Sequence, residues 1–230
     1  ISIPETDSKS ISDAAALINK SKKPFIVWGQ GVILGNAEKE FTEFIDKSGI
    51  PSAWTILGLS AIPTDHPLNV GMLGMHGNYG PNKLTNECDL LIAIGMRFDD
   101  RVTGDLKTYA RQAKIIHFEI DPAEINKNVK VDVAVLGDVK KTLKKILPKI
   151  IKKNHSTWIE KFRELNKIEF KKVIDTEYNK TSGGLSMAEV IKSINQNTNG
   201  ESILVTDVGQ HQMVACRYTK FNKSKSNITS

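Results

Sequence analysis

Charged side chains follow a predicted buried strand in the stretch LLIAIGMRFDDRVTG, residues 90–104. Apolar residues run up to a glycine, and the four charged residues beyond it are Arg97, Asp99, Asp100 and Arg101. An arginine can hold a phosphate group through two parallel hydrogen bonds, and a carboxylate accepts hydrogen bonds from hydroxyl groups. A local network of salt bridges is the alternative interpretation, but exposed pairs contribute only about 0–1 kcal/mol. We therefore predict a ligand site at the end of this strand.

The same chemistry recurs where the other predicted strands end. Ligands of open α/β sheets bind outside the carboxyl ends of the strands, so we expect these positions to meet in space. Glycines there allow a ligand to come close to the backbone, and carboxylates accept hydrogen bonds from ribose hydroxyls. These residue types fit a dinucleotide. They occur at Gly29-Gln30-Gly31, Thr55-Ile56, Glu119-Ile120-Asp121 and Gly137-Asp138.

Two glycine-rich stretches differ in how specific they are. GQGVILG, residues 29–35, is close to the G-x-G-x-x-G fingerprint but has one extra residue before its third glycine, so a tight turn explains it about equally well. GMLGMHGNYG, residues 71–80, has glycines at three-residue spacing, and each would cost a helix about 1 kcal/mol relative to alanine. We predict a backbone surface that presents Met75 and His76; a plain glycine-rich loop is the less favoured interpretation.

A further polar cluster follows the predicted strand in VTDVGQHQM, residues 205–213. Gln210 and His211 in this cluster are suited to contacts with anions and polar groups. No Ser-His-Asp spacing and no pair of metal-binding carboxylates accompanies them, so the sequence predicts no metal site. The spacing of the residues alone predicts a dinucleotide-binding α/β domain followed by the start of another domain.

The elements that must position these residues are short apolar strands alternating with helices. This alternation predicts a parallel sheet with helices on both faces, with five or six strands before residue 140. We place a domain boundary near residue 180, and we expect no element in the last ten residues. The predicted strands are 25–28, 50–57, 88–95, 114–121 and 131–138, and the predicted helices are 9–20 with a serine cap, 37–49 closed by a glycine, 140–153, 155–178 and 186–197.

Composition sets the broad class of protein. With 230 residues, 40% of them hydrophobic, the chain can bury a full core, and no apolar run approaches the length of a membrane span. The formal net charge of +6 comes largely from lysines in residues 140–153, on the polar face of a predicted helix, and no aromatic residues are interleaved to stack on bases. Neither a nucleic acid nor a membrane is therefore expected as a partner. Two cysteines indicate a reducing compartment, and an initial isoleucine indicates part of a longer protein.

Five motifs in order carry a resemblance to a known family. They are GMLGMHG, DLLIAIGMRFDDRVTG, HFEIDPAEINKN, LGDV and TDVGQHQM. Together they resemble the large catalytic subunits of acetolactate (acetohydroxyacid) synthases, which are thiamine-diphosphate enzymes. The resemblance covers nearly the whole chain and implies a six-stranded, Rossmann-like parallel sheet. It places a central FAD-binding domain at residues 1–152, a helical connecting segment at 153–183, and the start of a thiamine-diphosphate-binding domain at 184–230.

The resemblance also implies an activity for the full-length protein. These enzymes join two pyruvates, or pyruvate and 2-oxobutyrate, with loss of carbon dioxide, in branched-chain amino-acid synthesis. Thiamine diphosphate, Mg²⁺ and FAD are the implied cofactors, and a homodimer or tetramer with a small regulatory subunit is the implied assembly. The implied location is the cytoplasm, or the plastid in a photosynthetic eukaryote. We expect the 230 residues alone to be inactive, because the glutamate that activates thiamine lies in another domain of the family.

Individual site residues follow from the same resemblance. Asp100 and Arg101 match the substrate channel, and Gln210 and His211 match contacts to thiamine diphosphate. Gln30 replaces a glycine usual in the family, which weakens the expectation of close ligand approach there. Two alternatives remain: another thiamine-diphosphate oxidase or decarboxylase, or a non-catalytic nucleotide-binding module. The implied FAD contacts are Gly29, Gln30, Thr55, Ile56, Leu73, Gly74, Met75, His76, Gly95, Met96, Arg97, Phe98, Asp99, Glu119, Ile120, Asp138 and Val139.

Overall fold

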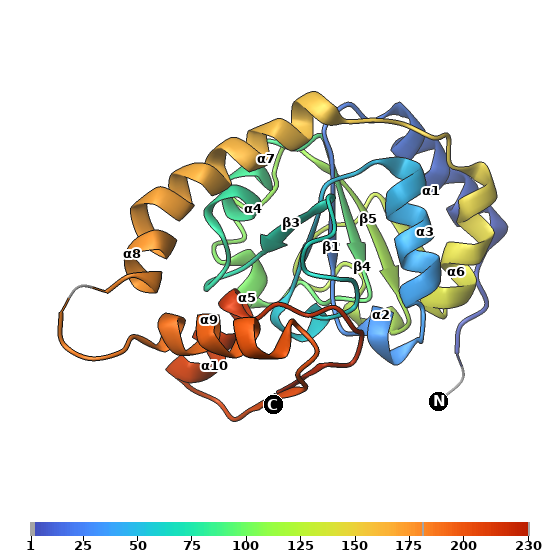
Figure 1. Ribbon diagram of the computed structural model, residues 1–230. Coiled ribbons are helices and arrows are strands. Elements are labelled where there is room, and N and C mark those ends of the chain that lie inside the picture. Colours follow the sequence, from blue (N-terminus) through green and yellow to red (C-terminus); the bar gives the residue numbers. More distant parts are fainter. Residues whose placement is uncertain (1–2, 181, 230) are drawn as a thin grey trace.

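A six-stranded parallel sheet forms the centre of the protein (Figure 1). The computed structural model describes residues 3–180 and 182–229. The strand order is β3-β2-β1-β4-β5-β6, the order of a doubly wound nucleotide-binding sheet, in which the chain reverses direction of travel between β1 and β4. The α/β fold expected from the sequence is confirmed. The strands are β1 (Pro24–Trp28), β2 (Ser52–Trp54), β3 (Asn69–Met72), β4 (Leu90–Ile94), β5 (Lys114–Glu119) and β6 (Val133–Leu136).

The edge strand β3 had no counterpart among the strands predicted individually. Its sequence, Asn-Val-Gly-Met, lacks an apolar run, and Gly71 adopts a positive φ of 117° that most residues avoid. The pairing of β3 with β2 is irregular between Ser52 and Trp54. This strand therefore forms because a neighbouring strand supplies its hydrogen bonds, which local sequence does not report.

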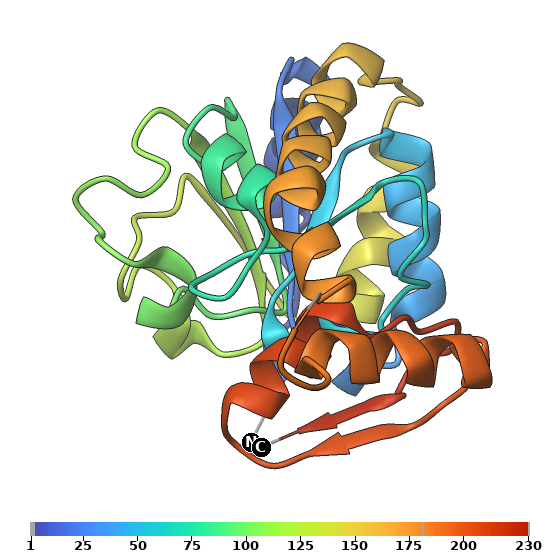
Figure 2. The ribbon, with the colours of Figure 1, turned by 60° about the vertical axis from the view of Figure 1, so that its left-hand side comes forward.

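Helices cover both faces of the sheet (Figures 1 and 2). Alternate residues of β1 point to opposite sides: Ile26 and Trp28 join the core under one group of helices, and Phe25 and Val27 join the core under the other. The first group is α1 (Ser8–Lys20), α3 (Glu38–Ser48) and α6 (Val139–Ile146), and the second is α4 (Tyr79–Leu84) and α7 (Ser156–Glu169).

The ends of two predicted helices can be compared directly with the structure. Gly49 closes α3 in a left-handed conformation with φ of 64°, as predicted. The predicted serine cap of the first helix is wrong, because the helix begins one residue earlier and Asp7 caps it. The Asp7 carboxylate accepts hydrogen bonds from the backbone N–H groups of Lys9 and Ser10, at 3.2 and 2.9 Å.

Short helical turns follow the carboxyl ends of four strands. They take up the segments in which the sequence places its glycines and charges, and they lie along one edge of the sheet. These turns are α2 (Gly31–Leu34), η1 (Ile56–Gly58), α5 (Asp100–Thr103) and η2 (Pro122–Glu124); a further short turn, η3 (Leu147–Lys149), follows α6 and is not one of them.

The predicted helix at 155–178 is present but contains a π-helical turn. Helix α7 passes directly into η4 (Phe170–Ile174), a π-helix, and then into α8 (Asp175–Tyr178). A π turn closes hydrogen bonds over five residues and so accommodates one additional residue relative to an α-helix. The charged sequence of this segment gives no signal for it.

Residues 184–229, here called the carboxy-terminal unit, lie below the sheet in Figures 1 and 2. Phe221 is fully buried in the main core together with Cys216, and the backbone N–H of Thr64 donates to the Phe221 carbonyl at 2.9 Å. The expectation of no element in the last ten residues is wrong, because a strand there pairs in parallel with a strand 23 positions earlier. The elements are α9 (Met187–Thr198), β7 (Leu204–Thr206), α10 (Gln210–Tyr218) and β8 (Asn227–Thr229).

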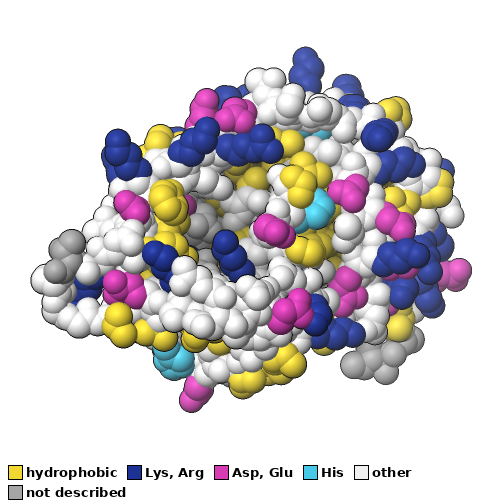
Figure 3. Space-filling model, in the orientation of Figure 1, with side chains coloured by type: hydrophobic (Ala, Val, Ile, Leu, Met, Phe, Trp, Pro, Cys, Tyr) yellow, Lys and Arg dark blue, Asp and Glu magenta, His cyan; other side chains and the backbone are white. Residues whose placement is uncertain are grey.

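The surface of the protein is uneven in character (Figure 3). Lys and Arg side chains gather over α1 and α6, and apolar side chains gather along the carboxy-terminal unit. Among the apolar residues of this unit, Leu185, Val205 and Val208 are 80%, 68% and 66% exposed. Of the helices in the described ranges, none combines the length and the hydropathy needed to cross a lipid bilayer.

Candidate functional site

The loops after β1 and β4 meet where the chain reverses its direction across the sheet. The Gly31 N–H donates to the Gly95 carbonyl at 2.9 Å, and the Gly29 N–H donates to the Ile94 carbonyl at 3.0 Å. A Cβ atom at Gly31 would lie 2.6 Å from the Cα of Gly95, closer than real contacts allow. These glycines therefore let two loops approach each other, and all three also line the cavity described next.

A cavity of about 970 Å³ opens at the same edge of the sheet. This volume is at the upper end of the range of about 300–1,000 Å³ for small-molecule sites. All residues expected to contact FAD line it except Phe98. The structure thus brings together Gly29, Gln30, Thr55, Ile56, Leu73, Gly74, Met75, His76, Gly95, Met96, Arg97, Asp99, Glu119, Ile120, Asp138 and Val139.

Phe98 requires a correction, because its ring lies in the core and not in the cavity. It is 5% exposed, and its ring packs edge-on against His117 with centroids 5.0 Å apart. Tyr109 contacts the same ring from another side, at 6.3 Å between centroids. Phe98 lies between two lining residues, Arg97 and Asp99, in a segment outside the strands, so sequence order alone did not distinguish it from them.

The remaining predicted site residues divide between lining and non-lining positions. Arg101 lines the cavity, whereas Asp100, the first residue of α5, is exposed and outside it. Gln210 and His211 are exposed at the start of α10 and also lie outside the cavity. The residues expected to contact thiamine diphosphate are therefore separate from those expected to contact FAD.

The two cavity arginines carry charges that the protein does not neutralise. Throughout residues 3–180 and 182–229, neither Arg97 nor Arg101 forms a side-chain hydrogen bond or an ion pair. Asp99 instead caps α5 by accepting a hydrogen bond from the Val102 N–H at 3.2 Å. The alternative of a local salt-bridge network is therefore wrong, and two guanidinium groups remain available to a ligand.

The glycine-rich loop after β3 is fixed in place by its neighbours. The side chain of Asn82 accepts from the Gly74 N–H at 3.0 Å and donates to the Gly74 carbonyl at 2.9 Å. The Met75 N–H donates to the Arg101 carbonyl at 2.8 Å, so this loop and α5 form one wall. Met75 is 60% exposed at the mouth of the cavity. The predicted backbone surface that presents Met75 and His76 is present.

Two carboxylates, Glu119 and Asp138, lie at the β5–β6 end of the sheet, opposite the β3 end. Burial alone would raise the pKa of Glu119, but hydrogen bonds from His117 and from the N–H groups of Ile120 and Asp121 outweigh burial and lower it. Asp138 caps α6 by accepting from the Lys141 N–H at 2.9 Å. One oxygen of each carboxylate thus accepts hydrogen bonds from backbone N–H groups that follow it in the chain.

Gln30 fits its position without backbone strain. Its φ and ψ are −61° and −25°, ordinary right-handed helical values, and its side chain is exposed at the start of α2. A glycine is therefore not required by the backbone at this position. Glutamine still occupies space that a ligand could use, because Gln30 lines the cavity.

The cavity also has lining residues that the sequence did not indicate. Val208, Gln212 and Met213 reach it from the carboxy-terminal unit, and Gln212 is 3% exposed. Its amide donates to the Thr229 hydroxyl at 2.6 Å, which links α10 to β8. These residues belong to the wall only because α10 lies across the edge of the sheet, a tertiary arrangement without a local signal.

No metal centre accompanies the cavity in the described part of the chain, where no group of three or more His, Cys, Asp or Glu side chains is arranged to hold an ion. The cavity itself suits an elongated anion. It offers apolar walls, two free guanidinium groups and loop carboxylates along one edge of a parallel sheet. FAD has this combination of aromatic rings, diphosphate and ribose, so the donor set fits it.

Comparisons with known proteins show which family the chain resembles. The chain is 40% identical over 225 residues to the "Probable acetolactate synthase large subunit" of Methanocaldococcus jannaschii, covering 96% of this chain and 38% of that protein. It is 38% identical over 220 residues to the "Acetolactate synthase large subunit" of Buchnera aphidicola subsp. Schizaphis graminum, with the same coverage of 96% and 38%. It is also 38% identical over 229 residues to the "Acetolactate synthase large subunit" of Corynebacterium glutamicum, covering 97% and 36%.

The chain therefore spans less than two fifths of the length of these curated relatives, at 38% of the first two. Residues 11–146 match the family described as "Thiamine pyrophosphate enzyme, central domain", and these residues contain all six strands of the main sheet. The chain belongs to the thiamine pyrophosphate enzyme family, and its main sheet is the central domain of that family.

Proposed function

We propose that the cavity at the carboxyl edge of the main sheet binds FAD. The observation that carries this proposal is the guanidinium group of Arg97, which has no side-chain partner in the described ranges and lines a cavity of about 970 Å³. A buried or half-buried diphosphate is stabilised by charge-assisted hydrogen bonds of this kind. Glu119 and Asp138 lie where the adenosine end would extend, toward β5 and β6.

We further propose that the full-length protein is an acetolactate synthase. It would join two pyruvates, or pyruvate and 2-oxobutyrate, with loss of carbon dioxide. The support is the similarity over 96% of the chain to proteins named as large subunits of that enzyme. Thiamine diphosphate, held through Mg²⁺, would supply the carbanion chemistry of the reaction. A homodimer or tetramer and a small regulatory subunit are proposed on the same similarity.

Roles for the other predicted site residues follow from this proposal. Gln210 and His211 would contact the thiamine cofactor, and Asp100 and Arg101 would face the substrate. The domain boundary is proposed near residue 180, with residues 184–230 as the start of the thiamine-diphosphate-binding domain. The exposed apolar side chains on the two-stranded sheet support this, because parallel sheets are ordinarily covered on both faces.

A flavin titration tests the proposal and separates it from the alternatives. We expect the apo-protein to bind one FAD with quenching of flavin fluorescence, and to bind ADP and FMN more weakly because each fills only part of the cavity. Equal or tighter binding of ADP would favour a related oxidase or decarboxylase whose central domain takes ADP. Binding to nucleic acid that weakens steeply with salt, without flavin binding, would favour a nucleotide- or nucleic-acid-binding module.

The 230 residues by themselves are expected to form no acetolactate. No Gly-Asp-Gly sequence occurs in them, and Gln210 and His211 alone cannot fix a diphosphate in position. An assay of acetolactate formation from pyruvate, with FAD, thiamine diphosphate and Mg²⁺ supplied, tests this. Turnover by these residues alone would contradict the proposed division of domains.

A further inference from the structure

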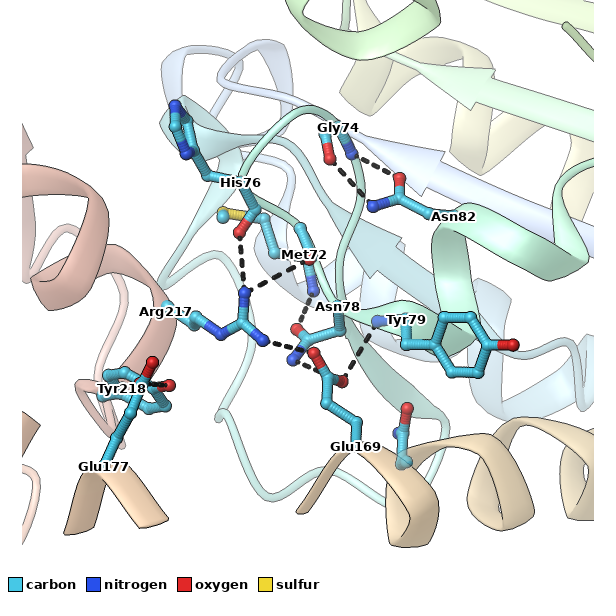
Figure 4. Close-up of polar contacts among 12 residues, drawn as sticks. Met72, Gly74, His76, Asn78, Tyr79, Asn82, Glu169, Glu177, Arg217 and Tyr218 are labelled. Atoms are coloured by element: carbon cyan, nitrogen blue, oxygen red, sulfur yellow. Dashed lines mark hydrogen bonds and ion pairs between the residues drawn. The ribbon is translucent and has the colours of Figure 1, made fainter. Parts of the chain in front are cut away.

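Arg217 on α10 connects three parts of the protein at one point (Figure 4). Its guanidinium forms an ion pair with Glu169 at the end of α7. The same group lies 3.5 Å from the carbonyl oxygen of His76 and 3.4 Å from that of Gly77. Arg217 thus contacts both the connecting helix and the loop that forms one wall of the cavity.

Glu169 extends this contact into the main sheet. Its second oxygen accepts hydrogen bonds from the Tyr79 N–H at 3.0 Å and from the Asn78 side-chain amide at 3.2 Å. Asn78 in turn accepts from the Met72 N–H at 2.9 Å, and Met72 is the last residue of β3 and lines the cavity. A continuous polar path therefore runs from α10 to the wall of the proposed flavin site.

The π turn places a second carboxylate beside the neighbouring residue of α10. Residues eight apart in an α-helix lie about 80° apart around the axis, at 100° per residue. Glu169 and Glu177 are eight residues apart. Because η4 takes up one extra residue, they lie almost as residues seven apart do in an α-helix, on one face of the helix. Glu177 accepts a hydrogen bond from the Tyr218 hydroxyl (Figure 4). Glu169 and Glu177 therefore accept hydrogen bonds from adjacent residues of α10, Arg217 and Tyr218.

The ion pair is more than a surface contact. The side chains of Glu169 and Arg217 are 5% and 20% exposed, so both charges have lost most of their water. Removing one partner of a buried pair leaves an uncompensated charge, which costs far more than breaking an exposed pair. The Tyr218 contact, by comparison, touches only α8 and leaves the cavity loop alone.

We propose that Arg217 is a positioning residue that holds the His76–Gly77 wall of the cavity and so couples docking of the carboxy-terminal unit to ligand binding. The ligand side of this inference rests on the proposed binding of FAD. The coupling has a direct physical basis, because one guanidinium on α10 contacts both Glu169 and the backbone of the loop that carries Met75 and His76. When α10 is docked, the loop is held in the conformation that completes the cavity.

Two single substitutions separate this role from general docking. Arg217→Gln removes the charge that faces Glu169 and the loop, whereas Tyr218→Phe removes only the hydroxyl that faces Glu177. Each is made in the full 230-residue chain. Flavin affinity is measured by titration, and amide hydrogen exchange is measured at Tyr79, whose N–H faces Glu169, and at Phe221, whose N–H donates to the Thr64 hydroxyl at 3.0 Å.

We expect Arg217→Gln to raise the dissociation constant for FAD about tenfold, the effect of one charge-assisted contact, and to speed exchange at Tyr79. Exchange at Phe221 should change little, because that residue is anchored separately. Tyr218→Phe should leave the FAD constant within about twofold of the wild-type value, since it breaks no contact to the cavity loop.

Two results would overturn the proposal. The first is unchanged FAD affinity and unchanged exchange at Tyr79 in Arg217→Gln. The second is an equal loss of affinity in both variants, which would show that general loosening of the unit, and not the Arg217 contact, is responsible. If the wild-type chain binds no FAD, the proposed function fails, and the exchange rate at Tyr79 in Arg217→Gln alone decides whether Arg217 holds the loop.

Discussion

The Nε2 atom of His117 lies 3.5 Å from an Oε2 oxygen of Glu119, two residues further along β5. The same nitrogen lies 2.8 Å from the carbonyl oxygen of Met96, which can only accept, so Nε2 carries a hydrogen. His117 is fully buried, and Glu119, which lines the cavity, is 8% exposed. His117 therefore links the segment after β4, which contributes Arg97, to the end of β5, which contributes Glu119.

The first prediction concerns the pH dependence that follows from Glu119. Its pKa lies below the ordinary 4.5, since hydrogen bonds to its charged form outweigh burial. A carboxylate with a depressed pKa stabilises the fold above pH 4.5, and this contribution is lost as the pH falls through the folded-state value. Glu119→Gln should therefore lower the free energy of unfolding by about 1.5 kcal/mol at pH 7 and by progressively less below pH 4.5. Urea unfolding at several pH values measures this, and a pH-independent difference would contradict it.

The second prediction concerns the close approach of the loops after β1 and β4. Gly31→Ala should lower the free energy of unfolding by about 1–3 kcal/mol, because the new Cβ would meet the Gly95 backbone at 2.6 Å. Alanine otherwise favours helix, so a clash is the only reason for a loss. Gln30→Ala, one residue earlier, is the control and should change stability by no more than about 0.5 kcal/mol. Equal urea midpoints for the two variants would show that the loops can separate without cost.

The sequence predicted most of the sheet and much of the cavity for one physical reason. The strands β1, β4, β5 and β6 are short and apolar, and each ends at a glycine or a charge, so strand ends could be read directly. Because the carboxyl ends of parallel strands share an edge, residues from 29 to 139 could be expected to line one site. The cavity lining agrees with this expectation at every FAD position except Phe98.

Features that depend on long-range contacts were not predictable in the same way. Strand β8 exists because β7 lies beside it, and β3 because β2 does. Gln212 became part of the cavity, and Arg217 part of its support, only when α10 lay across the sheet edge. The local sequence of α10, QHQMVACRY, carries no information about the surface that the helix will cover.

The third prediction divides the two arginines of the cavity by role. In the full-length protein, Arg101→Ala should lower turnover while bound flavin stays near stoichiometric, since Arg101 is proposed to face the substrate. Its neighbour Asp100 is exposed outside the cavity, so Asp100→Asn should also retain flavin. Steady-state kinetics and the flavin absorbance of the purified proteins are the measurements. Loss of flavin in proportion to activity would show that Arg101 belongs to the flavin contacts instead.

The fourth prediction concerns Arg97, whose guanidinium is exposed in the cavity and has no side-chain partner across the described ranges. Arg97→Ala should raise the dissociation constant for FAD by roughly 10- to 100-fold, because a charge-assisted hydrogen bond contributes about 1.5–3 kcal/mol. Stability without ligand should stay within about 0.5 kcal/mol of the wild-type value, since no contact of the protein is lost.

Arg111→Ala is the matched control for Arg97→Ala, because Arg111 is also exposed but lies outside the cavity. Both variants lose one positive charge, so a general effect of net charge on an anionic ligand would weaken binding equally in the two. A specific contact would weaken it only in Arg97→Ala. Flavin titration at two salt concentrations distinguishes these outcomes, because the general effect is screened by salt whereas a contact within the cavity is screened much less. An unchanged dissociation constant in Arg97→Ala would show that the diphosphate does not bind next to Arg97.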